Sequence, residues 1–233
     1  MAAARRLELR TLALTVVVSI GALGYVELAD EVREGETRSI DETLLLAMRS
    51  RSDLADPVGP RWFEETARDF TALGGSPVLL ALVAATTIYL LLARRRRAAL
   101  FVLVATGGGQ LLSSGFKAVF QRPRPALVPH GVFVYSASFP SGHAMMSAVT
   151  YLTLGALLAR LHRPPALKAF CLGLAAVLTL VVGASRVYLG VHWPTDVLAG
   201  WAAGSVWASA CWLVVLALQR RGKIEVGSGQ ALA

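Results

Sequence analysis

Three clusters of polar residues interrupt an otherwise apolar sequence, and the first is basic. It begins at Lys117 and ends with Arg124, which is followed by Pro125. Arginine presents a planar fork of N–H donors and lysine a point charge, so together they suit a tetrahedral phosphate. Basic residues at the end of an apolar segment also extend toward lipid head groups, and that is the alternative interpretation. Arg122 is an additional base to which the sequence assigns no definite role.

The second cluster is the tetrapeptide from Pro140 to His143, directly before an apolar run. Ser141 is placed to cap a helix, and Gly142 lets the backbone approach an anion toward which free N–H groups point. His143 would lie in the first helical turn, where an imidazole can give a proton to a leaving oxygen. An ordinary helix start with a hydrogen-bonded histidine is the alternative.

The third cluster contains Ser185, Arg186, His192 and Asp196. His192 precedes a helix start marked by Pro194, and Asp196 follows in the first helical turn. At this spacing a carboxylate can hold one imidazole nitrogen and aim the other, which makes a nucleophile. A structural contact between the histidine and the aspartate is the alternative.

The elements that must position these clusters are membrane spans. Of the 233 residues, 55% are apolar and 16% charged, and the mean hydropathy is +0.56, which is typical of a membrane protein. The net charge of +8 sits at the ends of apolar runs, so lipid head groups explain it better than nucleic acid. Six apolar segments are long enough, or nearly so, to cross a bilayer: 11–28, 76–93, 98–120, 142–159, 166–184 and 195–219.

The distribution of lysine and arginine predicts the topology. Basic residues near both chain ends and in the second and fourth connections mark one side, which the positive-inside rule makes cytoplasmic. Both termini are then cytoplasmic, and the segments 29–75, 121–141 and 185–194 lie on the opposite face. All three clusters fall on that outer face. The expected fold is all-α: one membrane-embedded domain over residues 1–233, with six transmembrane helices in a bundle.

The long outer segment, 29–75, is predicted to hold two short amphipathic helices. A capping-box pattern at 39–42 precedes a leucine-rich run, and a second helix begins near Pro60 and stops at Gly74 and Gly75. The second helix either lies at the level of the lipid head groups or forms a soluble cap packed on the spans. The glycine-rich tail, 224–233, is predicted to be flexible.

Taken together, the clusters resemble the three-part signature of the type-2 phosphatidic acid phosphatase superfamily, over residues 117–196. The order and internal spacings match. The resemblance implies that His192 attacks phosphorus and forms a phosphohistidine, and that Asp196 orients it. It further implies that His143 protonates the leaving group. The residues it assigns to binding the phosphoryl oxygens are Lys117, Arg124, Ser141, Gly142 and Arg186.

The resemblance also implies a reaction without a metal or other cofactor, and the sequence places no carboxylate cluster beside the basic residues. The expected partners are membrane lipids and a lipid phosphate or diphosphate: phosphatidic acid, phosphatidylglycerol phosphate, a polyprenyl diphosphate or a phosphorylated lipid A. The expected location is the inner membrane of a bacterium, with the active site facing the periplasm. The sequence leaves the oligomeric state open.

Three other functions use the same residues. A transporter would need polar groups near the middle of the membrane, whereas these crowd one end of the spans. Vanadate-dependent haloperoxidases carry a similar signature but are soluble. A lipid phosphotransferase, which passes the phosphoryl group to an alcohol instead of water, stays open.

Overall fold

The computed structural model describes residues 2–130 and 136–220, and within them the regular secondary structure is helical. The tail predicted to be flexible, 224–233, lies outside the described residues. The helices are α1 (Ala2–Glu34), α2 (Arg38–Leu46), α3 (Arg61–Ala72), α4 (Ser76–Leu92), α5 (Arg96–Phe120), α6 (Gly142–Leu161), α7 (Pro165–Tyr188) and α8 (Pro194–Arg220).

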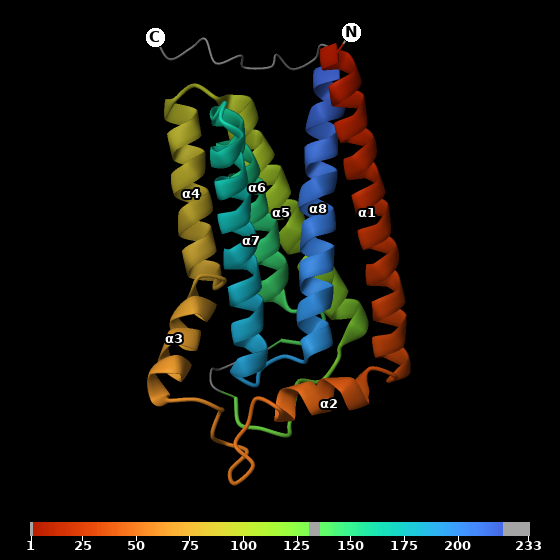
Figure 1. The fold of residues 1–233 in the computed structure, drawn as a ribbon, viewed down its shortest axis with the longest axis vertical. Helices are drawn as coiled ribbons and strands as arrows, with labels where there is room; N and C mark the ends of the chain where they lie inside the picture. The colour runs from red at the N-terminus through yellow and green to blue at the C-terminus, as the bar shows by residue number, and fades with distance from the viewer. Residues whose placement is uncertain (1, 131–135, 221–233) are drawn as a thin grey trace.

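The long helices run along the longest axis of the molecule, and α2 and α3 lie at one end of it (Figure 1). Among the described residues, five helices are long and apolar enough to cross a membrane, and α3 with α4 forms a sixth candidate as a pair bent by 45°. The prediction of an all-α bundle of membrane-spanning helices is therefore confirmed. The beginning of α1 and the end of α8 lie together at the end opposite α2 and α3 (Figure 1).

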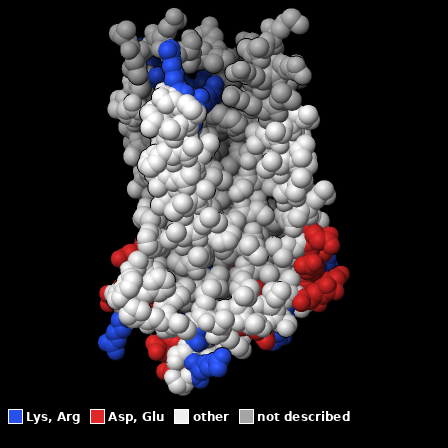
Figure 2. All heavy atoms as spheres, in the orientation of Figure 1, with Lys and Arg blue, Asp and Glu red and all other residues white. Residues whose placement is uncertain are grey.

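Charge differs between the two ends of the bundle. Figure 2 shows basic side chains at the end where α4 turns into α5, and this turn contains the arginines at 94–97. Acidic side chains gather at the other end, over the last turns of α1 (Figure 2). Basic side chains are also visible at this second end, so the difference between the two ends in this view lies in the acidic side chains.

Helix α6 is the centre of the bundle and packs against α5, α7 and α8. The contact with α8 is close because α8 has glycines where the two helices meet. A Cβ atom at Gly200 would lie 2.7 Å from the carbonyl oxygen of Ser141, and one at Gly204 would lie 2.5 Å from that of Met145. Small residues at such positions let membrane helices approach each other. This packing brings the beginning of α8 against the beginning of α6.

Three predicted boundaries were wrong. The first span was predicted to end at 28, but α1 continues to Glu34, so residues 29–34 belong to this helix and not to the outer segment. The last turn of α7 reaches Tyr188, so Ser185 and Arg186 belong to a helix and not to the loop predicted at 185–194. The capping box at 39–42 does not form, because α2 has its N-cap at Thr37, two residues before Ser39. Ser39 is inside the helix, and Asp41 is fully buried in contact with α8.

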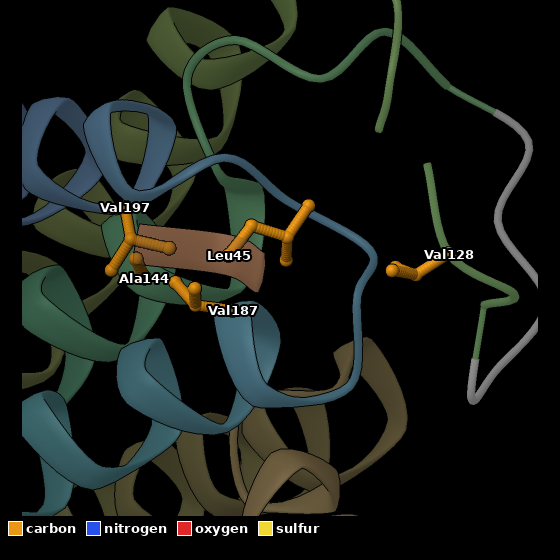
Figure 3. Packing of buried hydrophobic residues seen from close by; sticks show 5 residues of the cluster. All are labelled: Leu45, Val128, Ala144, Val187 and Val197. Carbon is orange, nitrogen blue, oxygen red and sulfur yellow. The ribbon is translucent and has the colours of Figure 1, made fainter. Parts of the chain in front are cut away.

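Helix α2 closes the end of the bundle at which α3 also lies, and it does so with one buried leucine. Leu45 lies in a core cluster with Val128 of the loop, Ala144 of α6, Val187 of α7 and Val197 of α8 (Figure 3). Each of these residues is almost completely buried. Because the cluster joins three spans at the ends that carry the polar residues, α2 belongs to the folded core and is not a loose surface helix.

Helix α3 packs on the end of α7. The ring of Phe63 meets that of Tyr188 edge to face, with the centroids 5.0 Å apart, and Arg186 donates a hydrogen bond from Nη1 to Oγ1 of Thr71 at 3.0 Å. Trp62, on the other hand, keeps 64% of its surface exposed. One face of the helix therefore caps a span, as one of the two predicted alternatives has it, while Trp62 lies on an exposed face.

Candidate active site

The three clusters meet at a cavity of about 840 Å³ that begins at the end of the bundle closed by α2. The cavity is lined by six of the eight residues predicted for the site: Lys117, Arg124, Gly142, His143, Arg186 and His192. The other two, Ser141 and Asp196, lie behind this surface and are fully buried. The residues come from α5, α6, α7, α8 and two connecting loops, so the site exists only when the bundle is assembled.

His192 lies in the short connection between α7 and α8 with its two ring nitrogens in different surroundings. Nδ1 is 3.3 Å from Oδ2 of Asp196, and Nε2 is 3.1 Å from Nη1 of Arg124. A guanidinium can only donate, so Nε2 is the acceptor and the ring proton is on Nδ1. The unprotonated nitrogen therefore faces the cationic side of the cavity, as a nucleophile requires.

Asp196 is fixed by both its place in α8 and its partners. It is the third residue of α8, and its Oδ2 accepts the backbone N–H of Trp193 at 3.0 Å, in the manner of a capping-box acid. Ser138 donates its hydroxyl to the same oxygen, and Arg122 donates to Oδ1 at 2.6 Å. With three donors at Oδ2 and a guanidinium at Oδ1, the carboxylate is held ionised and cannot rotate away from His192.

Burial lowers the pKa of His192 to about 3, and the nearby cations Arg124 and Arg186 act in the same direction. The hydrogen bond and charge of Asp196 oppose this shift without cancelling it. The imidazole is consequently neutral across the physiological range, which keeps Nε2 available for attack on phosphorus.

Backbone carbonyl groups position two of the three cations. Lys117 donates to the carbonyl oxygen of Ala137 at 2.6 Å, and Arg124 donates to those of Ser136 at 2.8 Å and Val191 at 2.6 Å. Neutral acceptors orient these side chains without cancelling their charge. Burial lowers the pKa of Arg124, but a guanidinium keeps its proton at neutral pH. The cavity therefore has an excess of positive charge suited to a phosphoryl group.

Arg186 is the third cation, and it is 3% exposed. Thr71 of α3 accepts from its Nη1, whereas its Nε has no hydrogen-bond partner among the described residues. A buried donor without a partner is costly, and an anion in the cavity would supply one. The sequence did not predict that α3 contributes to the site through Thr71, because the two residues are 115 positions apart.

The beginning of α6 forms another side of the cavity. Ser141 is the N-cap of α6, and its hydroxyl accepts the backbone N–H of Ala144 at 3.5 Å. Its side chain therefore caps the helix. The backbone N–H groups of Gly142 and His143 lie in the first turn, where a helix offers them no internal partner. Gly142 and His143 both line the cavity. This helix end adds neutral donors and a partial positive charge to the three cations.

The cavity continues from the cations into the depth of the bundle. Along α5 it passes Ser113, Ser114 and Gln110 and reaches Thr106 and Gly107. At a rise of about 1.5 Å per residue, the eleven positions from Lys117 to Thr106 span roughly 16 Å. The opposite wall, from α4, is apolar and includes Leu79, Leu80 and Val83. Such a cavity can hold a phosphate group at its outer end and an extended chain beyond it.

Sequence reasoning missed Ser138, which donates a hydrogen bond to Asp196, and Asp41, which forms an ion pair with Arg122. It left Arg122 itself without a role. Ser138 lies two residues before Pro140, so its proximity to the second cluster was a usable signal. Asp41 gave none, because it bonds to the backbone of Thr195, 154 positions away.

No group of three or more His, Cys, Asp or Glu side chains in the described ranges could hold a metal ion. The groups that line the outer end of the cavity are instead three cations and two histidines.

Comparison with known proteins gives concordant matches. A sequence model of the PAP2 superfamily matches residues 98–220. Phosphatidylglycerophosphatase B of Bacillus subtilis is 33% identical over 184 residues, which cover 78% of this chain and 86% of that protein. An undecaprenyl-diphosphatase of Sulfolobus acidocaldarius is 39% identical over 82 residues, which cover 35% of this chain and 32% of that protein. The crystal structure of a transmembrane PAP2-type phosphatidylglycerolphosphate phosphatase from Bacillus subtilis superposes with a TM-score of 0.73 and 28% identity, covering 91% of this chain and 98% of that one.

Proposed function

This chain belongs to the PAP2 superfamily and is a lipid phosphatase, and from that premise we propose that it works through a covalent phosphohistidine at His192. One observation carries the proposal. The Nδ1 atom of His192 is held by Asp196, while Nε2 is unprotonated and lies beside Arg124 on the cationic side of the cavity. A neutral imidazole aimed at an anion site is equipped to attack phosphorus.

In the first step, Nε2 of His192 forms a bond to phosphorus as the bond from phosphorus to the leaving oxygen breaks. His143 gives a proton to that oxygen. Lys117, Arg124 and Arg186 stabilise the charge on the phosphoryl oxygens, together with the N–H groups at the beginning of α6. In the second step a water molecule, deprotonated by His143, attacks the phosphohistidine and releases inorganic phosphate. Asp196 keeps the proton on Nδ1 throughout and compensates the positive charge on the ring.

We propose that the reaction needs no metal ion. The three cations at the outer end of the cavity provide the charge stabilisation that a divalent cation would otherwise give, and they would repel such an ion. Phosphate release in the presence of a chelator tests this, and the proposal predicts an unchanged rate.

The proposed substrate is a lipid whose phosphate is joined to its chains by a further polar linker, as in phosphatidylglycerol phosphate. The relative that aligns with most of this chain is named for that substrate. The cavity also agrees, because polar side chains of α5, Ser113, Ser114 and Gln110, line it next to Lys117, while the wall from α4 is apolar. A polyprenyl diphosphate is the second candidate, since a shorter stretch of the chain matches an undecaprenyl-diphosphatase.

We further propose that both chain ends are cytoplasmic and that the site opens at the periplasmic face of a bacterial inner membrane, within a single domain over residues 1–233. The arginines at the turn between α4 and α5 lie at the end opposite the cavity, which supports this orientation. Accessibility labelling of single cysteines in spheroplasts, one in that turn and one beside Trp62, tests it. The residue beside Trp62 should react with an impermeant reagent from outside, and the other should not.

The test of the enzymatic proposal is phosphate release by the purified protein in detergent, with a chelator present and without added metal. Phosphatidylglycerol phosphate, phosphatidic acid and undecaprenyl diphosphate are compared for the wild type and His192→Ala. We expect the highest kcat/KM for phosphatidylglycerol phosphate, no release by the variant, and an acid-labile phosphoenzyme only in the wild type. Equal release by the variant would overturn the assigned nucleophile, and transfer of phosphate to an added alcohol in place of water would identify a phosphotransferase.

A further inference from the structure

We propose that Arg122 and Asp41 are positioning residues that set the orientation and charge of Asp196, so that α2 is part of the catalytic apparatus. The inference rests on the proposed function only in that Asp196 orients His192. Arg122 was an unassigned base in the sequence, and Asp41 lies outside the matched segment 98–220. Neither residue lines the cavity, so both would act through Asp196.

Arg122 joins the two carboxylates with its two terminal nitrogens. Nη1 lies 2.6 Å from Oδ1 of Asp196, and Nη2 lies 2.7 Å from Oδ2 of Asp41. The guanidinium is 14% exposed, the carboxylates 1% or less, and it also stacks over the ring of Trp193 at 5.7 Å. A planar fork shared by two buried carboxylates has one geometry, which lysine cannot reproduce.

Asp41 reaches the beginning of α8 as a capping residue from another helix. Its Oδ1 accepts the backbone N–H of Thr195 at 2.9 Å, and its Oδ2 accepts the hydroxyl of the same residue at 2.6 Å. Thr195 is the second residue of α8, where an N–H lacks a partner within the helix. A carboxylate there satisfies this donor and also interacts favourably with the helix dipole. Asp196 is the next residue, so its backbone is fixed by the same bond.

The position of Asp41 is itself fixed by packing. Leu45, one turn further along α2, is completely buried in the cluster with Ala144, Val187 and Val197 (Figure 3). Residues four apart lie on the same face of a helix, so the contact that buries Leu45 also directs Asp41 at α8. The packing of α2 on the bundle therefore also determines the orientation of Asp196.

The charges in this cluster give the arrangement a direct effect on catalysis. Two carboxylates share one guanidinium, which leaves one negative charge in excess beside His192. A histidine that carries phosphate on Nε2 and a proton on Nδ1 has a positive ring, and the excess charge stabilises it. Without Asp41, the positive charge of Arg122 would be balanced by Asp196 alone. The attraction between Asp196 and the positive imidazole ring would then be weaker.

The test uses the full-length protein with the variants Asp41→Asn, Arg122→Gln and the double variant. We expect each single change to lower kcat by about 10-fold, equivalent to about 1.4 kcal/mol of transition-state stabilisation, because a charge-assisted hydrogen bond is lost. KM should stay within about 2-fold, since the cations that bind phosphate are unchanged. In the Arg122→Gln background, Asp41→Asn should lower kcat by less than about 3-fold, because the guanidinium that links Asp41 to Asp196 is absent.

Glu42→Gln is the matched control. It makes the same chemical change at a neighbouring residue on α2, whose side chain pairs on the surface with Arg38. Its kcat should equal that of the wild type. Arg122→Lys is the variant to use if the others fold poorly. It keeps the positive charge, so its thermal stability should be close to that of the wild type. Its kcat should still be at least about 5-fold lower, because one ammonium group cannot bridge both carboxylates.

Additive effects of the two substitutions on log kcat, a change confined to KM, or wild-type kcat in Arg122→Lys would each overturn the proposal. His192→Ala, measured in the same series, separates this result from the proposed function. If His192→Ala is inactive while Asp41→Asn and Arg122→Gln turn over normally, only the positioning role falls.

Discussion

The Nδ1 atom of His192 lies 3.3 Å from Oδ2 of Asp196, four residues further along the chain. The short connection before α8 and the first turn of that helix hold the two residues in this relation, and the other carboxylate oxygen receives Arg122. The pair therefore has one ring orientation and one tautomer before any substrate arrives. Its consequences can be tested by changing the carboxylate, the pH, the cavity and the packing of α8.

Asp196→Asn should lower kcat by at least about 100-fold without unfolding the protein. The amide can present its NH2 to Nδ1, which would move the ring proton to Nε2 and remove the nucleophilic electron pair. Steady-state phosphate release and thermal unfolding in detergent measure the two effects. Asp69→Asn, at an exposed position of α3, is the control and should be fully active. An active Asp196→Asn protein would contradict the assigned tautomer.

The pH dependence of stability should report the neutral state of His192. Its pKa falls from 6.5 to about 3 on folding, so the unfolded protein binds a proton between these values that the folded protein does not. The contribution of His192 to the free energy of unfolding is fully present above pH 6.5. It is lost as the pH falls toward 3, by at most about 1.4 kcal/mol per pH unit. Thermal unfolding of the wild type and His192→Gln from pH 7 to pH 4 should show a steeper loss for the wild type. Parallel curves would contradict a buried neutral imidazole.

Gly107→Leu should obstruct the inner part of the cavity. Gly107 lines the cavity, and a Cβ atom there would meet no other atom within 4 Å, so a larger side chain enters free space. Leucine also favours a helix over glycine, and the fold should not suffer. We expect KM for a long-chain substrate to rise by about 10-fold or more, while a short-chain phosphate is hydrolysed normally. Gly115→Leu, on α5 but outside the cavity, should leave both substrates unaffected.

Gly204→Ala should separate α8 from α6. The added methyl group would lie 2.5 Å from the carbonyl oxygen of Met145 and 2.7 Å from the Cβ of Ala148, so one helix must move. Overpacking of this kind costs about 1–3 kcal/mol. Thermal unfolding should show a lower midpoint, and phosphate release should fall because Asp196 begins the displaced helix. In Gly24→Ala of α1 the methyl group meets nothing within 4 Å, and that variant should match the wild type.

The spans and the order of the site residues could be predicted from the sequence because both are local properties. A run of apolar residues must form a helix to satisfy its backbone in a bilayer, and its ends are marked by charge, proline and glycine. The predicted span limits agree with α4, α5, α6 and α8 to within two residues. The end of α7 was placed too early because charged Arg186 was taken as the end of the apolar run, whereas its guanidinium is buried against Thr71.

The sequence by itself thus determined that the chain is a helical membrane protein, and it predicted the histidines, the cations and Asp196 as the reactive groups, because these properties depend on composition and short spacing. Only the tertiary structure decided which groups hold Asp196. Asp41 and Thr195 are 154 positions apart, and Arg122 and Asp196 are 74 apart. Contacts at such separations depend on how the helices pack, and packing is decided by the shapes of buried faces, such as the one around Leu45, that no local pattern encodes.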